Sequence, residues 1–338
     1  ELGLVQSTAD YCVFYSNGAS KIQVCLYVDD GICTGVTEEV ILEFLDKLKE
    51  KIEIKVKPLQ FFLGLQIERT PNMGVIVHQR QYIKDLLEKY QMQNSKPVST
   101  PVGKDIYSED NSEPVDITSY QELIGSIMYL AQGSRPDIAF GISVLSRYMH
   151  CPTKNLMNHA KRVLKYLNAT QNYGIHYDGD KDGAFQFFCD SDYAACKKTR
   201  KSTTGIIIFS NGSPLYWASR KQPTVSLSTC ESETIAAADL AEVALWFHRL
   251  VSELGYSDIP IMQLDNQAAL RLVKESQLSR RTRHMEVRHL FIQEKIAEKK
   301  LEVTFVPSDK NLSDICTKPM NKSCFQRLRD LLGIKPIG

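Results

Sequence analysis

Apolar and polar positions in the C-terminal half of the chain follow two periods, which separate strands from helices. Apolar runs over 184–190, 204–209 and 214–219 predict three strands, and Asn211-Gly212 between the last two predicts a tight turn. The pattern then predicts a long helix over 230–254, a strand at 259–265, helices at 266–275 and 285–299, and a strand at 301–306. Three leading antiparallel strands followed by alternating helices and strands favour a mixed α/β sheet.

Shorter apolar runs occupy the N-terminal part of the chain. Runs over 11–15 and 22–28 flank Asn17-Gly18, which predicts a hairpin, and the second run continues into Asp29 and Asp30. Proline, serine, glycine and acidic residues over 94–116 predict a linker, and 168–183 is predicted to be a turn-rich joint. The pattern predicts helices over 38–51, 80–90, 120–131, 136–148, 155–167 and 325–332, and strands over 61–67 and 75–77.

Composition narrows the class of protein. Hydrophobic residues make up 43% of the chain and charged residues 24%, which is ordinary for a globular protein. The net charge of +1 means that local patches would have to bind any nucleic acid. Nine cysteines without a C-x-x-C pair favour a reducing compartment. No apolar stretch approaches the roughly 20 residues of a membrane span. A first residue that is Glu rather than Met indicates a chain cut from a longer one.

Four acidic residues lie where predicted strands end or where a predicted helix begins. Asp190 ends an apolar run, and Glu233 opens the long helix. Asp265 ends the next strand, and Asp314 follows the last one. Acids from separate elements can converge into a cage for two Mg²⁺ ions, which prefer oxygen ligands. The alternative is that each acid only caps a helix or faces solvent.

A series of short motifs runs along the chain in a fixed order. They are Y-V-D-D at 27–30, D-S-D-Y-A-A at 190–195, R-K-S-T-T-G at 200–205, W-A-S-R-K-Q at 217–222, S-T-C-E-S-E at 228–233, D-N-Q at 265–267, R-T-R-H at 281–284, N-L-S-D at 311–314 and T-K-P at 317–319. The series resembles the C-terminal part of the Pol polyprotein of copia-type LTR retrotransposons, and the resemblance spans nearly the whole chain.

The resemblance implies an α/β (α+β) fold. A truncated reverse-transcriptase palm and a helical thumb and connection would precede a ribonuclease H-like domain with a mixed sheet. The implied boundaries are 1–93 for the end of the palm and the start of the thumb, 94–180 for the linker and helical thumb or connection, 181–320 for the ribonuclease H-like domain, and 321–338 for a C-terminal helical tail.

The resemblance also implies an enzyme that cuts the RNA strand of RNA–DNA hybrids with two Mg²⁺ ions, for which Mn²⁺ would substitute. Strand geometry leaves Asp192 open beside Asp190, and Glu231 competes with Glu233. The resemblance selects as catalytic metal ligands Asp190, Glu233, Asp265 and Asp314. The alternative function is a catalytically silent transposon remnant or a nucleic-acid-binding subunit.

Asp29 and Asp30 resemble a remnant of the polymerase site. A further aspartate would belong to an earlier palm strand, so polymerase activity is expected only in the full-length parent. Many ribonucleases H use a histidine in the loop after the last strand for product release, but residues 306–311 of this chain contain none. His284 and His289 are the candidates to replace it, with a helix-capping role as the alternative. Two basic groups are expected to bind hybrid phosphates, with a solvated loop as the alternative: Lys197, Lys198, Arg200 and Lys201, and Arg280, Arg281, Arg283 and His284.

The expected partners are an RNA–DNA hybrid and the rest of the Pol polyprotein, without a membrane, and dimerisation stays open. The expected location is a virus-like particle in the cytoplasm, with the nucleus as the alternative.

Overall fold

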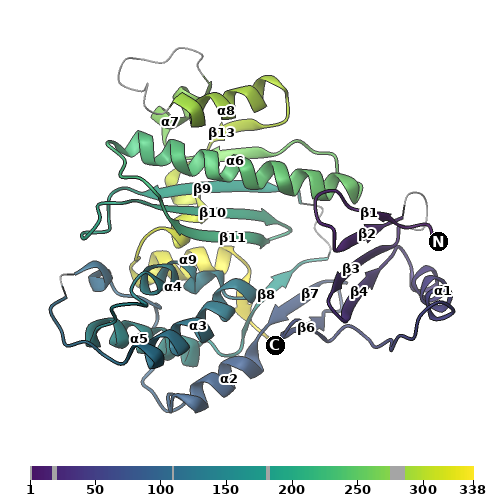
Figure 1. Cartoon of the computed structure of the whole chain (residues 1–338), viewed down its shortest axis with the longest axis horizontal. Coiled ribbons are helices and arrows are strands. Elements are labelled where there is room, and N and C mark those ends of the chain that lie inside the picture. Colours follow the sequence, from purple (N-terminus) through teal and green to yellow (C-terminus); the bar gives the residue numbers. More distant parts are fainter. Residues whose placement is uncertain (1, 17–20, 109, 180–182, 275–285) are drawn as a thin grey trace.

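The computed structural model describes residues 2–16, 21–108, 110–179, 183–274 and 286–338. Within these ranges the chain forms three β-sheets with helices packed between and around them (Figure 1). No helix in this part of the chain combines the length and the apolar character that crossing a membrane requires.

The first sheet is a small antiparallel meander at the N-terminus. Its strands β1 (Val5–Gln6), β2 (Val13–Tyr15), β3 (Gln23–Tyr27) and β4 (Asp30–Thr34) pair in chain order. Helix α1 (Glu38–Lys49) covers it, and Phe44 of this helix packs on Ile22 and Val24. The core of this part is small, so most of its side chains are partly or fully exposed.

The N-terminal meander also contacts a helix from the C-terminal half of the chain. The backbone N–H and the hydroxyl of Thr8 donate to Oε1 of Glu253, and the indole of Trp246 donates to the carbonyl of Ala9 at 3.2 Å. Both partners lie on helix α6 (Thr229–Glu253), and Figure 1 shows β1 and β2 beside the C-terminal end of that helix.

The second sheet combines strands from three distant segments. Its order is β14-β8-β7-β6-β5, and every pairing is antiparallel. β8 lies in the segment 168–183 that the sequence predicts as a turn-rich joint, and β14 lies in the predicted helical tail 321–338. The strands are β5 (Phe61–Phe62), β6 (Leu65–Arg69), β7 (Val75–His78), β8 (Tyr173–Tyr177) and β14 (Ile334–Pro336).

The helical middle of the chain shares one hydrophobic core with its neighbours. The segment 94–116, predicted as a linker, packs into this core through Val102 and Ile106. Phe188 and Ile207 of the third sheet belong to the same core, so the helical part and the last domain are joined through it. The helices are α2 (Arg80–Lys89), α3 (Ile117–Gly133), α4 (Ala139–Ser146), α5 (Lys154–Ala169) and α9 (Lys322–Leu331), with 3-10 helices η1 (Lys104–Tyr107) and η2 (Pro136–Ile138).

A fully buried ion pair lies inside this core. The guanidinium of Arg135 donates two hydrogen bonds to the carboxylate of Asp137, at 2.9 and 2.8 Å. The side-chain hydroxyl and the carbonyl of Thr170 accept further bonds from Arg135, and the Tyr166 hydroxyl donates to Asp137 at 2.6 Å. Because both charges are paired and hydrogen-bonded, the low-dielectric interior tolerates them.

The third sheet has the mixed topology that the sequence predicts. Its order is β11-β10-β9-β12-β13, with β9, β10 and β11 antiparallel and β9, β12 and β13 parallel. The strands are β9 (Gln186–Asp192), β10 (Thr203–Ser210), β11 (Ser213–Lys221), β12 (Ile261–Leu264) and β13 (Glu302–Phe305). The central strand β9 is covered on both faces, because Phe188 packs in one large core and Phe187 and Cys189 pack in the other.

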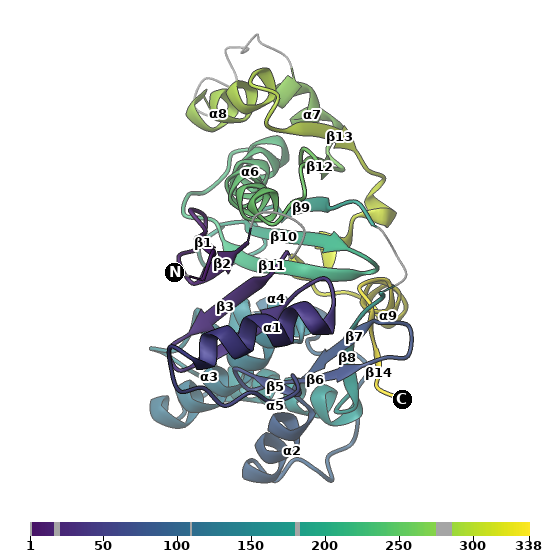
Figure 2. The same cartoon turned by 90° about the vertical axis from the view of Figure 1, so that its right-hand side faces the viewer.

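Two different layers cover the faces of this sheet (Figures 1 and 2). Helix α6 lies on one face, where its alanines bring its backbone close to Phe187 and Cys189, and α7 (Gln267–Lys274) and α8 (Glu286–Ala297) extend that layer. The 3-10 helix η5 (Leu312–Cys316) covers the other face at Gly205. A Cβ atom at residue 205 would lie 2.8 Å from the carbonyl oxygen of Ser313, so only glycine allows this approach.

Candidate metal centre

Strand β9 brings Asp190 to the middle of the third sheet. Its side chains alternate between the two cores, because Phe187 and Cys189 pack under α6 while Phe188 packs in the core shared with the helical part. Asp190 is the next residue of the strand after Cys189, and it is buried, with 4% of its surface exposed. The Thr317 hydroxyl donates a hydrogen bond to Oδ2 of Asp190, which orients the carboxylate.

The start of helix α6 explains the two glutamates that compete in the sequence. The hydroxyl of Ser228 accepts from the backbone N–H of Glu231 at 3.1 Å, and Oε2 of Glu231 accepts from the backbone N–H of Leu227 at 2.6 Å. This arrangement is close to a capping box, in which a serine and a glutamate three residues later satisfy the free N–H groups of a helix. Glu231 therefore has a structural role, and Glu233 is the glutamate that lies near Asp190 and Asp265.

Asp265 is aligned with Asp190 by the register of two parallel strands. In the β9–β12 pair Gln263 lies opposite Phe188, so Asp265, just after β12, lies level with Asp190 inside β9. One carboxylate oxygen each from Asp190, Glu233 and Asp265 lies within 4.8 Å of the other two. In the described part of the chain, the structure thus brings three of the four predicted acids into one group.

Asp314 approaches the same group from η5, through a lysine. Nζ of Lys318 lies 2.8 Å from Oδ1 of Asp314 and 3.5 Å from Oδ2 of Asp190. Asn311 fastens this segment to the sheet, because its side-chain amide donates to the carbonyl of Cys189 at 2.9 Å. Sequence reasoning gave no role to Lys318, Thr317 or Asn311, although the N-L-S-D and T-K-P motifs contain all three.

Asp190, Glu233, Asp265 and Asp314 form an acidic cluster whose electrostatics favour a bound cation. Burial, followed by the charge of Asp190, raises the pKa of Glu233 to about 9 and the pKa of Asp314 to about 7. The same two causes raise the pKa of Asp265. Carboxylates that repel one another in a poorly solvated site gain most from a bound ion, and hard oxygen donors suit a divalent ion such as Mg²⁺. The donor set therefore fits the metal that the resemblance implies.

Asp192 stands outside the three-residue group. Burial and the charge of Asp190 raise its pKa to about 6, and its Oδ2 is buried without a hydrogen-bond partner among the described residues. The charge of Lys318, followed by that of Arg147, opposes this effect and lowers the pKa of Asp192. Asp192 is therefore a neighbour of the acidic cluster rather than a member of it.

The two aspartates of the polymerase motif lie far from the acidic cluster in the sequence, at the tip of the β3–β4 hairpin. Tyr27 pairs with Asp30 across a two-residue turn at Val28 and Asp29. Val28 has a φ of 53°, in the left-handed region that a valine rarely adopts, and its side chain is 89% exposed. Asp29 and Asp30 are both exposed.

The predicted phosphate-binding residues have mixed outcomes. Lys197, Lys198 and Arg200 are exposed in the connection between β9 and β10. Nζ of Lys201 instead donates to the carbonyl of Pro223 at 2.6 Å, which ties two loops together. The second basic group, Arg280, Arg281, Arg283 and His284, lies outside the described residues.

His289, a predicted substitute for the product-release histidine, is wholly buried in α8. Neither of its ring nitrogens has a hydrogen-bond partner within the described ranges, and burial lowers its pKa. A buried ring of this kind has no contact with a substrate, so His289 does not suit product release. It does not cap a helix either, because a cap needs a hydrogen bond to the helix end.

Comparison with known proteins identifies the family. Residues 1–104 match the family "Reverse transcriptase (RNA-dependent DNA polymerase)". The Retrovirus-related Pol polyprotein from transposon RE1 of Arabidopsis thaliana is 32% identical over 98% of this chain and 23% of its own length. An uncharacterised mitochondrial protein of the same plant is 33% identical over 65% of this chain and 92% of its own length. The chain belongs to the family of copia-type retrotransposon Pol polyproteins.

The chain is much shorter than the transposon polyproteins to which it is similar. It spans about a quarter of the length of the transposon polyproteins that it matches. Among solved structures, the foamy viral protease-reverse transcriptase in complex with dsDNA has a TM-score of 0.44 and 12% identity, over 84% of this chain and 55% of that chain.

Proposed function

We propose that this chain is the ribonuclease H part of a retrotransposon Pol polyprotein together with an incomplete part of its reverse transcriptase. Its reaction is endonucleolytic cleavage of the RNA strand of RNA–DNA hybrids, dependent on Mg²⁺. The observation that carries the proposal is the convergence of Asp190, Glu233 and Asp265 within 4.8 Å on the central strand, the helix and the next parallel strand of the sheet. Carboxylates without histidine or cysteine suit Mg²⁺, and paired divalent ions support phosphodiester cleavage.

Each residue around the centre has a definable task. Asp190, Glu233, Asp265 and Asp314 would hold the divalent ions. When bound, these ions supply an activated water and neutralise charge on the phosphate. Thr317 orients Asp190 through its hydroxyl, and Asn311 holds the segment of Asp314 against β9. Burial of Asp190 and Glu233 keeps bulk water from their carboxylates.

The substrate would be held by residues outside the acidic cluster. Lys197, Lys198 and Arg200 are exposed and follow the strand that carries Asp190, so they can neutralise phosphates of a bound hybrid. The polymerase activity is proposed for the whole polyprotein, because Asp29 and Asp30 supply only part of a polymerase site. The proposed setting is a virus-like particle in the cytoplasm, where the rest of Pol is also present.

The test is cleavage of a labelled RNA–DNA hybrid by the purified chain, with and without Mg²⁺. Asp190→Asn keeps the shape of the side chain and removes the charge that holds metal, so we expect cleavage to fall by about 10³-fold or more. Hybrid affinity should stay within about twofold, because phosphate contacts are made elsewhere. Asp258→Asn, the same change at an exposed residue of this part of the chain, is the matched control.

Two results would contradict the proposal. One is full activity in Asp190→Asn. The other is a wild-type chain that binds the hybrid but does not cut it at any Mg²⁺ concentration, which would favour a silent remnant or a nucleic-acid-binding subunit.

A further inference from the structure

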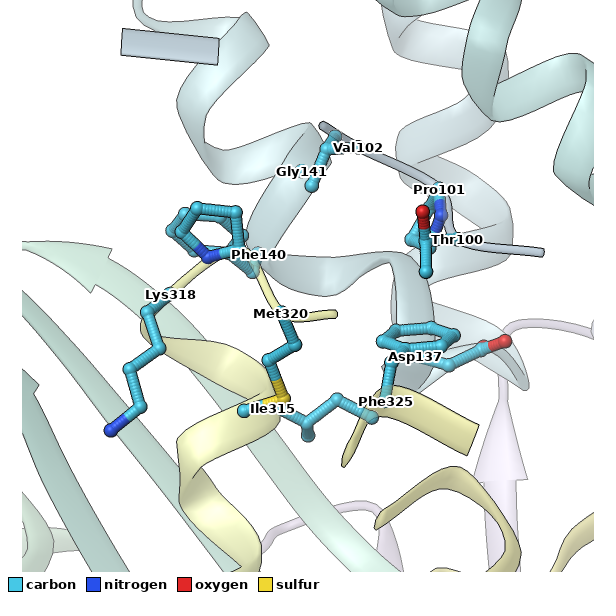
Figure 3. A pocket seen from close by; sticks show the side chains of 11 residues that line it. Thr100, Pro101, Val102, Asp137, Phe140, Gly141, Ile315, Lys318, Met320 and Phe325 are labelled. Carbon is cyan, nitrogen blue, oxygen red and sulfur yellow. The ribbon is translucent and has the colours of Figure 1, made fainter. Parts of the chain in front are cut away.

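Lys318 places an ammonium group between two acids of the candidate metal centre. Its Nζ is 2.8 Å from Oδ1 of Asp314, which is hydrogen-bonding distance, and 3.5 Å from Oδ2 of Asp190. The stem of the side chain lines a small pocket beside Phe140 and Met320, and Figure 3 shows it extending away from the Thr100 and Val102 side of that pocket. The ammonium thus reaches the acids from the side of the helical part of the chain.

We propose that Lys318 is the internal counter-ion of the metal-free centre and that a divalent ion displaces its ammonium from Asp190 and Asp314. This inference rests on the proposed metal centre and assigns to a further residue the control of how tightly metal binds. In the metal-free chain the lysine offers a single positive charge to a group of four carboxylates. A divalent ion offers twice that charge and can coordinate several carboxylate oxygens at once.

The burial of the three side chains shows why displacement is feasible. The side chains of Asp190 and Asp314 are 5% and 15% exposed, whereas that of Lys318 is 42% exposed. The acids are therefore held in place, and the lysine has a path to solvent along its flexible stem. The backbone on either side stays fixed, because Thr317 is hydrogen-bonded to Asp190 and Pro319 packs in the small pocket.

A lysine in this position has two opposite effects on the protein. Without metal it stabilises the fold, because it compensates acids that repel one another. With metal it competes, because its contacts with Asp190 and Asp314 must first be broken. A purely structural lysine would have the first effect only, so metal affinity separates the two roles.

The experiment measures binding of Mg²⁺ and of Mn²⁺ to the purified chain by calorimetry, without nucleic acid. We expect Lys318→Met to bind metal about tenfold more tightly than wild type, which corresponds to about 1.4 kcal/mol. Lys318→Arg keeps the charge and should bind metal as weakly as wild type. The matched control is Lys322→Met, which removes the same charge from an exposed position at the start of α9.

Thermal unfolding gives the second measurement. In EDTA, Lys318→Met should unfold at a lower temperature than wild type, and saturating Mg²⁺ should close the gap, because tighter binding adds more stability. Equal or weaker metal affinity in Lys318→Met would overturn the role of the lysine while leaving the metal centre intact. Absence of metal binding in every variant would overturn the centre itself and the proposed function with it.

Discussion

Replacing Glu233 with Gln should make the metal-free protein more stable at neutral pH, although it removes a residue of the proposed centre. The glutamate is 7% exposed, and burial together with the charges of Asp190 and Asp265 raises its pKa from 4.5 to about 9. Hydrogen bonds from Ser191 oppose this effect only in part. The folded, metal-free chain therefore holds a proton on Glu233 at pH 7 that the unfolded chain releases.

The magnitude follows from linkage between protonation and folding. Because the unfolded state binds fewer protons between pH 4.5 and about 9, stability is highest below 4.5 and falls as pH rises through this window. At pH 7 the interval is about 2.5 units, each equivalent to about 1.4 kcal/mol, so the cost is about 3 kcal/mol. Gln carries no proton to release and avoids this cost. Glu233→Gln should therefore exceed wild type by about 2–3 kcal/mol at pH 7 in EDTA.

The assay is urea unfolding in EDTA at several values of pH, followed by tryptophan fluorescence. The protein has two tryptophans, Trp217 on β11 and Trp246 on α6, and both report on the part of the chain that holds the acids. The advantage of the variant should shrink to nothing near pH 4.5 and grow as pH rises. Saturating Mg²⁺ should reduce or reverse it, because wild type gains more from the ion.

The control is Glu242→Gln, which makes the same change at an exposed position of the same helix and should shift stability little at any pH. The reasoning is refuted if Glu233→Gln is less stable than wild type in EDTA at pH 8. It is also refuted if the difference between them does not depend on pH.

Two further predictions concern other parts of the chain. Asp137→Asn leaves the fully buried Arg135 without its counter-charge, so the free energy of unfolding should fall by about 3–5 kcal/mol. Urea unfolding monitored by circular dichroism measures this loss, and an unchanged midpoint would show that the pair makes no net contribution to stability. The purified chain should not extend a DNA primer on an RNA template, although Asp29 and Asp30 are exposed at the tip of their hairpin. Detectable primer extension would contradict the proposal that the polymerase site is incomplete.

The third sheet could be predicted from the sequence because its signals are local. Its first three strands are seven, eight and nine residues long and each contains an apolar run. Asn211-Gly212 marks the turn between two of them, where Asn211 has a φ of 51° and Gly212 a φ of 80°. Asp190, Glu233 and Asp265 each occur near the end or start of an element that the sequence predicts, and the structure brings them together. Their catalytic role remains a prediction.

The second sheet could not be predicted, because its signals are not local. β14 has three residues, and its partner β8 lies more than 150 positions earlier in the chain. Short strands of this kind are stabilised by pairing and by burial of Ile334 and Ile175 in the common core, neither of which shows in a local pattern. For the same reason the proline-rich segment 94–116 looked like a linker, although Val102 and Ile106 are buried.

The division between the two large cores bears directly on the proposed centre. Glu233 and Asp265 belong to elements that pack in the core under α6, whereas Asp314 and Lys318 lie in a segment whose neighbours, Ile315 and Cys316, pack in the core of the helical part. The centre is therefore assembled from two sides, and Asp190 on the central strand contacts both of them. A change in the packing of α9 or α4 would first move Asp314 and its lysine, and would leave the group of Asp190, Glu233 and Asp265 in place. Sequence motifs taken one by one cannot reveal this, because the N-L-S-D and T-K-P segments acquire their position only when the helical part folds against the sheet.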